Sequence, residues 1–318
     1  MARVLRLPER GSVPGVSARR PRSPADLPKL PHHPLPAGHV VVEIRADPAR
    51  KGGRLVLQDG VESSYVDVLD PTHLEFEYLR HLARVIDVMH PKRRPMAMVQ
   101  IGGGPCVLPR YLDATRRDLR AVVIERDPEV IAIAREWLGL QTSERLDVRI
   151  GDGRDQLESI APGSLDVLVV DAFAGVVVPH HLTTVEFVDT ARRTLADDGI
   201  HVVNLIDLPP LGYAAGVVAT FRDRYASVVL LADTATIARQ TSGNVVIVAT
   251  DRDVPVEQLS RLAGLDHDPW EVLSGKRLDR LVEGAAPLYD DVAPQHTLAV
   301  LGPLWGRSRD AHARAARA

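Results

Sequence analysis

The sequence predicts an α/β protein with a parallel sheet covered by helices, preceded by a small antiparallel β domain. Between residues 96 and 250, short runs of Val, Ile and Leu alternate with amphipathic segments, and strands that are apolar on both faces are typical of parallel sheets. Three short β-rich runs separated by glycine turns precede them. Apolar residues make up 45% of the chain, which is enough for a substantial core.

Both ends of the chain are expected to lie outside this core. Residues 1–36 are rich in proline and arginine and poor in large apolar side chains, so they bury too little surface to offset the entropy of ordering. We predict a disordered basic tail that serves as a solvated linker, with binding to an acidic partner as the alternative. Residues 305–318 are predicted to form a second, polar tail.

The small domain is placed at residues 37–72 as an antiparallel meander. Turn chemistry at residues 51–53 and 58–60 separates its strands. The predicted strands are Val40–Ile44, Arg54–Leu57 and Ser64–Val68.

The main domain is placed at residues 73–304 and is expected to begin with a helix. Thr72 and Glu75 resemble a capping box at its amino terminus. The apolar positions at helical spacing are Leu74, Tyr78, Leu82, Val85 and Ile86. The buried strands that follow are Met98–Ile101, Ala121–Ile124, Val148–Ile150, Val167–Val170, Ile200–Leu205, Val228–Leu231 and Val245–Ala249. Right-handed crossovers between such strands put a ligand at their carboxyl ends.

Glycines and an acid stand where the first two of these strands end. Gly102, Gly103 and Gly104 follow the first strand, and residues without side chains let the backbone at a helix amino terminus approach a ligand closely. Glu125 ends the second strand about 20 residues later, where a carboxylate can accept hydrogen bonds from both hydroxyls of a ribose. A steric turn and a capping or surface acid are the alternatives.

Two further acids end the third and fourth strands. Asp152, held between Gly151 and Gly153, is suited to accept a hydrogen bond from an adenine amino group, with an ordinary turn as the alternative. Asp171 lies beside the expected reactive end of the nucleotide and is the candidate catalytic residue, because a carboxylate there can hold an ammonium and take its proton. A structural role is its alternative. Residues from about Met96 to Thr250 therefore predict a nucleotide-binding domain of the S-adenosylmethionine-dependent transferase type.

Composition argues against several other classes. The 39 basic and 42 acidic residues give a net charge of -3, so no global field favours nucleic acid or a membrane surface. Cys106 stands alone, which excludes an internal disulfide, and we interpret it as a packing residue rather than a reactive thiol. His180 and His181 have no further ligand at suitable spacing, so we expect no metal and place them along the acceptor loop. Without a spanning segment or a secretory signal, the expected location is the cytoplasm.

The strand-end elements and the small β domain together resemble the spermidine synthase (polyamine aminopropyltransferase) family, over roughly residues 40–300. The resemblance implies a Rossmann-like S-adenosylmethionine-dependent methyltransferase fold with a seven-stranded sheet. It also implies S-adenosylmethionine or its decarboxylated form as co-substrate, no metal, a small amine or other nucleophilic acceptor, and a homodimer with the meander at or near the contact. The stretches that carry it are Leu57–Ser63, Ile101–Gly104, Val123–Ile131, Gly151–Gly153 with Asp171, and Tyr289–Pro294.

Two departures from the family pattern bear on the reaction. The family's glycine loop continues with an aspartate that helps position the aminopropyl group and would repel the carboxylate of intact S-adenosylmethionine, and here Pro105 stands in its place. After the catalytic aspartate the family typically has another acid followed by proline, whereas this chain has Ala174 and Gly175. Since each lost charge-assisted bond is worth about 1–3 kcal/mol, putrescine is expected to be a poor acceptor.

Three hypotheses for the activity stay open. The resemblance favours aminopropyl transfer, and Pro105 favours methyl transfer from intact S-adenosylmethionine. A catalytically silent relative that binds a nucleoside or a protein partner is the third. Weaker candidates for rebuilding an acidic acceptor pocket are Glu62, Glu75, Glu77, Asp290 and Asp291.

Overall fold

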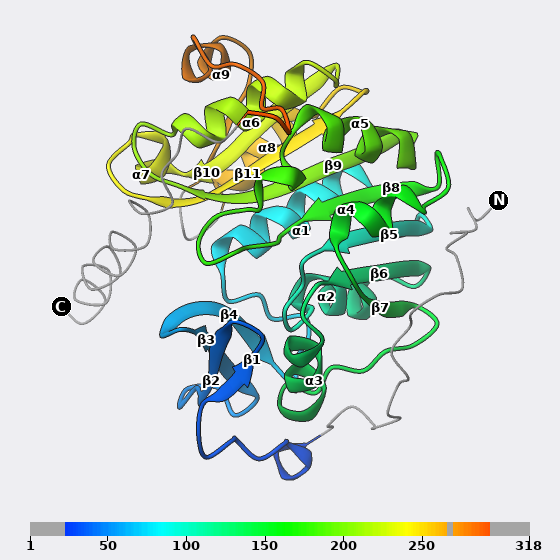
Figure 1. Cartoon of the computed structure of the whole chain (residues 1–318), viewed down its shortest axis with the longest axis vertical. Helices are drawn as coiled ribbons and strands as arrows, with labels where there is room; N and C mark the ends of the chain where they lie inside the picture. Colours follow the sequence, from blue (N-terminus) through cyan, green and yellow to red (C-terminus); the bar gives the residue numbers. More distant parts are fainter. Residues whose placement is uncertain (1–22, 266–269, 293–318) are drawn as a thin grey trace.

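The computed structural model describes residues 23–265 and 270–292, which form a small and a large sheet (Figure 1). The small sheet is antiparallel, with its four strands in chain order. This confirms the predicted meander and adds one strand ahead of it. The strands are β1 (Leu35–Ala37), β2 (Val40–Ala46), β3 (Gly53–Gln58) and β4 (Val61–Asp67).

The large sheet has the strand order β12-β10-β11-β9-β8-β5-β6-β7. Strands β5 to β9 run parallel to one another, whereas the contacts of β10 with β11 and β12, and of β11 with β9, are antiparallel. All seven predicted strands are present. The strands are β5 (Met96–Ile101), β6 (Leu119–Glu125), β7 (Leu146–Ile150), β8 (Leu165–Val170), β9 (Leu195–Asp207), β10 (Ser227–Asp233), β11 (Gly243–Thr250) and β12 (Trp270–Leu273).

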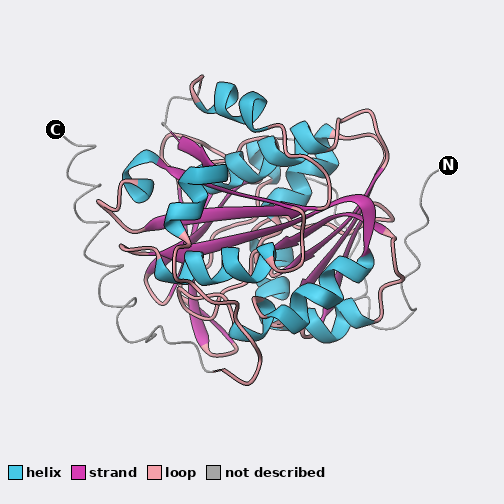
Figure 2. Cartoon of the chain, turned by 90° about the horizontal axis from the view of Figure 1, so that it is seen from above, coloured by secondary structure: helices cyan, strands magenta, loops and turns pink. Residues whose placement is uncertain are grey.

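Helices cover both faces of the large sheet, as the apolar strands predict (Figure 2). Buried residues of α1, α2, α3 and α8 form one core with the sheet, and those of α4, α5, α6 and α9 form the other. The α-helices are α1 (Glu77–Met89), α2 (Val107–Thr115), α3 (Pro128–Trp137), α4 (Gly153–Glu158), α5 (Val185–Thr194), α6 (Gly212–Arg222), α7 (Thr234–Ile237), α8 (Val256–Ala263) and α9 (Gly275–Leu281). The short 3-10 helices are η1 (Pro24–Asp26) and η2 (His180–Leu182). No helix among the described residues has the length and apolar character needed to cross a membrane.

The structure corrects two of these expectations. The predicted tail ends too late, because Leu27, Leu30 and Leu35 pack against the core before residue 36. Residues 1–22 and the predicted tail at 305–318 lie outside the described residues. The sheet has eight strands rather than seven, since the four residues of β12 are too few to give a periodic signal.

The predicted capping box is wrong. Helix α1 begins at Glu77, and its N-cap residue Phe76 makes no capping bond through its side chain. The Thr72 hydroxyl donates instead to Asp70, at 2.5 Å, and the Glu75 carboxylate pairs with a neighbouring histidine. These local bonds hold the segment in a turn, so the helix starts later than the sequence pattern suggests.

Candidate active site

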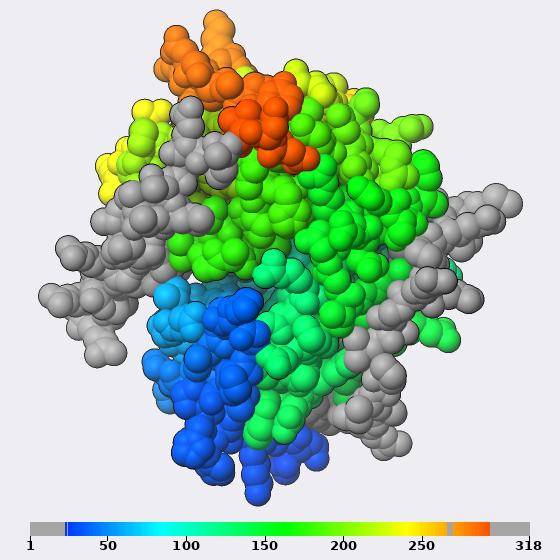
Figure 3. Space-filling view, in the orientation of Figure 1, coloured from blue at the N-terminus to red at the C-terminus, as the bar shows by residue number. Residues whose placement is uncertain are grey.

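A cavity of about 1410 Å³ is lined by residues of both domains. Figure 3 shows the surface of the small β domain, in blue, directly beside that of the large domain, in cyan to green. Glu125, Asp152 and Asp171 all line this one cavity. The structure thus brings the three predicted carboxylates together at the carboxyl ends of β6, β7 and β8.

The glycine turn between β5 and α2 forms one wall of the cavity, and its three glycines have different roles. A Cβ on Gly102, at φ 72°, would lie 2.5 Å from the carbonyl oxygen of Asp171, and one on Gly103 would lie 2.5 Å from Val123. Chain packing therefore requires these two glycines. Gly104 has nothing within 4 Å of its would-be Cβ, at φ 43°, so this residue leaves the cavity open to a ligand.

Glu125 is held against this turn. One carboxylate oxygen accepts hydrogen bonds from the backbone N–H groups of Gly103 (3.2 Å) and Gly104 (3.3 Å), and the other accepts from the N–H of Asp127 (3.0 Å). The side chain is half-buried, so its oxygens still face the cavity. This fixed orientation suits the predicted role of accepting hydrogen bonds from a ribose diol.

Asp152 caps helix α4 and pairs with His181. Its Oδ1 accepts hydrogen bonds from the N–H groups of Arg154 (2.8 Å) and Asp155 (3.3 Å), and its Oδ2 lies 3.0 Å from Nε2 of His181. Burial raises the pKa of Asp152, but these partners outweigh burial, and the net pKa lies below its ordinary value. Asp152 is therefore an ionised acceptor at neutral pH, and Gly153 is required because a Cβ there would lie 2.2 Å from Ile101.

Asp171 is the carboxylate with the most unusual environment. The Asn204 side-chain N–H donates to Oδ1 at 2.9 Å, and the Tyr78 hydroxyl donates to Oδ2 at 3.4 Å. Burial raises the pKa of Asp171 to about 6, although both hydrogen bonds lower it. Burial and Asp171 together raise the pKa of Tyr78 well above its ordinary value, so its hydroxyl remains a donor.

Three polar residues near Asp171 were missed by sequence reasoning. Tyr78 was interpreted only as an apolar helix position, yet it lines the cavity. Gln100 and Asn204 also line it, at 2% and 1% exposure. Gln100 interrupts the otherwise apolar β5, and Asn204 interrupts the apolar run at residues 202–206 of β9. Such an interruption near the carboxyl end of a buried strand is the signal that would have found them.

The weaker acceptor candidates separate into two groups. Glu62, Glu75 and Glu77 line the cavity. Asp290 does not line it, because its carboxylate binds the Arg154 guanidinium (2.8 Å) and accepts from the Thr184 hydroxyl (2.7 Å). The exposed Asp291 does not line it either.

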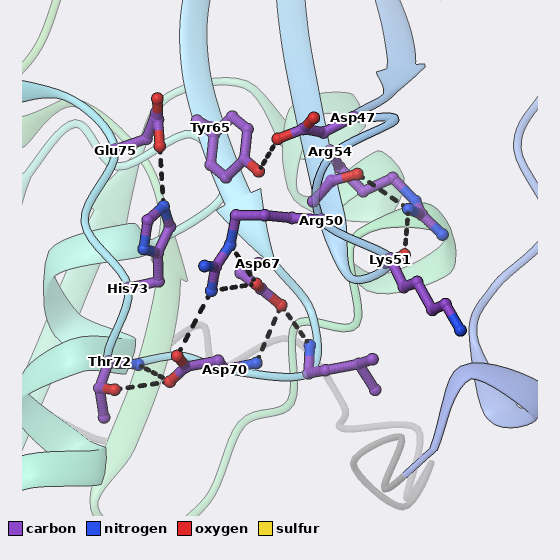
Figure 4. Close-up of polar contacts among 12 residues, drawn as sticks. Asp47, Arg50, Lys51, Arg54, Tyr65, Asp67, Asp70, Thr72, His73 and Glu75 are labelled. Carbon is purple, nitrogen blue, oxygen red and sulfur yellow. Dashed lines mark hydrogen bonds and ion pairs between the residues drawn. The ribbon is translucent and has the colours of Figure 1, made fainter.

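A polar network in the small domain supports the wall that carries Glu75 (Figure 4). Arg50 binds Asp67 at 2.8 Å and Asp70 at 3.5 Å, which ties the β2–β3 turn to the segment leading into α1. The Tyr65 hydroxyl donates to Asp47 at 2.6 Å. Because this segment is anchored, Glu75 and its partner His73 (2.8 Å) are held beside the cavity.

Cys106 and the two adjacent histidines have structural partners. Cys106 is fully buried in the core, and burial raises its pKa to about 12, which confirms its interpretation as a packing residue. His180 lies 2.9 Å from the carbonyl oxygen of Tyr289, and His181 pairs with Asp152. Within the described ranges, no group of three or more His, Cys, Asp or Glu side chains could hold a metal ion.

Comparisons with known proteins show likenesses to spermidine synthases in sequence and fold. Residues 75–205 match the family model of the spermine/spermidine synthase domain. The polyamine aminopropyltransferase of Chromobacterium violaceum is 30% identical over 142 residues, which cover 44% of this chain and 53% of that protein. The chain spans about half the length of the curated relatives it matches.

Solved structures extend the likeness to most of the chain. A probable spermidine synthase from Corynebacterium glutamicum has a TM-score of 0.76 at 28% identity, covering 83% of this chain and 98% of that one. The spermidine synthase of Thermotoga maritima, at 19% identity and a TM-score of 0.59, covers 79% of this chain and 87% of its own and supports the fold alone.

Proposed function

Because this chain belongs to the spermidine synthase family, we propose that it transfers the aminopropyl group of decarboxylated S-adenosylmethionine to an amine acceptor. The observation that carries the proposal is the convergence of Glu125, Asp152 and Asp171 on one cavity. In this proposal Gly104 and Glu125 bind the ribose, Asp152 binds the adenine, and Asp171 faces the reacting atoms.

The reaction needs alignment and a base. The acceptor nitrogen attacks the carbon next to the sulfonium, so a C–N bond forms, the C–S bond breaks, and its electron pair returns to sulfur to give methylthioadenosine. The new ammonium then loses a proton to the Asp171 carboxylate. With a pKa of about 6, Asp171 is ionised at neutral pH and is a stronger base than an ordinary aspartate.

The acceptor end of the cavity is supplied by the small domain. Glu62, Glu75 and Glu77 give it acidic side chains, which suits a cationic amine. The negative charge of Glu62 is partly offset by its electrostatic interaction with Arg45, and Glu75 is paired with His73. The resemblance further favours a homodimer, and Val41 on β2, at 47% exposure, is an apolar side chain that such a contact would cover.

Methyl transfer from intact S-adenosylmethionine is the second candidate. The observation that favours it is Pro105, which lines the cavity where the family's loop aspartate would stand. Without that negative charge, a donor carboxylate meets less repulsion at the glycine turn.

Calorimetry with the purified protein separates the candidates. We expect methylthioadenosine to bind, decarboxylated S-adenosylmethionine to bind more tightly, and the wild type to release methylthioadenosine when a panel of amines is added. Asp171→Asn should bind the same ligands and release none. Turnover with intact S-adenosylmethionine alone would favour methyl transfer, and absence of nucleoside binding would leave only the silent relative.

A further inference from the structure

Gln100 is a buried polar side chain that faces the cavity without a complete set of partners. It is 2% exposed and lines the cavity, and its carbonyl oxygen Oε1 accepts no hydrogen bond from any described residue. Buried side-chain oxygens in folded proteins are nearly always hydrogen-bonded. A ligand donor is therefore expected to complete this one.

The place of Gln100 in the sheet indicates which part of a ligand it meets. Strand β5, which carries it, lies between β6, which ends at Glu125, and β8, which Asp171 follows. Neighbouring strands are about 4.8 Å apart, so the two carboxylates stand on strands about 10 Å apart. A donor with its ribose at Glu125 and its reactive carbon at Asp171 must cross the end of β5.

Gln100 also points to the face of the sheet on which Asp171 is found. In the register Gln100 lies beside Val169, two residues before Asp171, and side chains two apart in a strand share a face. Met98 and Val169 both belong to the core under α1, the helix that brings Tyr78 to Asp171. The Gln100 amide thus opens toward the reacting end of the donor.

We propose that Gln100 accepts a hydrogen bond from the primary ammonium at the end of the donor's three-carbon tail. The inference rests on the proposed function, because it says how the same site recognises its donor. The oxygen of a neutral amide can accept a hydrogen bond from an ammonium group. The adjacent glycine turn has Pro105 where an acidic residue could otherwise bind that group. Intact and decarboxylated S-adenosylmethionine carry this ammonium on the same carbon. Gln100 accepts both, and a carboxylate in its place would repel the intact donor.

Binding measured by calorimetry at pH 8 tests this with three ligands and three variants. Gln100→Met keeps the size of the side chain and removes the acceptor, so both tail-bearing donors should bind about tenfold more weakly, while methylthioadenosine, which lacks the tail, binds as to wild type. Gln100→Glu should raise the preference for the decarboxylated donor about tenfold or more. Gln58→Met makes the same change elsewhere in the cavity wall and should alter neither ratio.

The outcomes separate this inference from the function on which it rests. If wild type binds methylthioadenosine and Gln100→Met keeps wild-type affinity for both donors, the role of Gln100 is refuted while the nucleoside site stands. If wild type binds none of the three ligands, both fall. Should Gln100→Met lose methylthioadenosine, the Gln100→Glu ratio decides alone, and an unchanged ratio overturns the proposal.

Discussion

Replacing the candidate base should make the protein more stable. Burial holds the pKa of Asp171 at about 6, against 3.8 for an ordinary aspartate, so the folded state favours the protonated carboxyl. The stability that this group contributes is complete below pH 3.8 and is lost as pH rises through 6. The pKa is raised by about two units, and each unit corresponds to about 1.4 kcal/mol. Ionised Asp171 therefore destabilises the folded state by about 3 kcal/mol at pH 7.

Asp171→Asn removes this titration and keeps the shape of the side chain. We expect its free energy of unfolding to exceed that of wild type by up to about 3 kcal/mol at pH 7, and most of the gain to vanish at pH 4. Urea unfolding at pH 7, 5.5 and 4 measures the difference, and the activity of the variant should be lost throughout.

The matched control is Asp118→Asn, which makes the same change at an exposed aspartate. Its difference from wild type should be small. A destabilising buried charge at Asp171 is refuted if Asp171→Asn is no more stable than wild type at pH 7, or if its gain is equally large at pH 4.

Three further predictions follow from named contacts. Asn204→Leu removes a hydrogen bond that lowers the pKa of Asp171, so the acidic limb of the pH–rate profile, expected near pH 6, should move to higher pH; an unmoved limb contradicts the contact. Cys106, buried and with a pKa of about 12, should resist a thiol reagent at pH 8 until urea unfolds the protein, and rapid native labelling would disprove its burial. Gly102→Ala forces a Cβ to within 2.5 Å of backbone and should lower the melting temperature far more than Gly163→Ala, which meets nothing within 4 Å; equal losses would refute the packing.

The sequence predicts those parts of the fold that repeat a signal over many residues. The positions of seven apolar strands are predicted correctly, because each has enough consecutive apolar residues to indicate a buried strand and not an element at the surface. The acids at the ends of β6, β7 and β8 share one cavity because consecutive parallel strands end at the same edge. The sequence shows which segments are strands and where each strand ends, and the convergence of the three acids follows from these two observations.

Features that depend on individual side-chain partners, and not on a repeated pattern, escape the sequence. Glu75 was assigned to a capping box, but its carboxylate binds His73, a local bond that competes with the helix. Asp290 was placed in the acceptor pocket, yet Arg154 of α4 holds it elsewhere. Tyr78 has the spacing of a core residue, and only the packing of α1 across the sheet reveals its contact with Asp171.

The contact between Arg154 and Asp290 also matters for anyone who shortens this chain. Asp290 lies far along the sequence from α4, yet it anchors the helix whose N-cap is Asp152, and the neighbouring Leu288 carbonyl receives the N–H of Val185 at the start of α5. Residues 288–290 thus tie α4 to the start of α5, next to Asp152, for which a contact with adenine is proposed. Truncation before residue 288 would keep every residue of the proposed nucleotide pocket, but it would release the helix that orients Asp152.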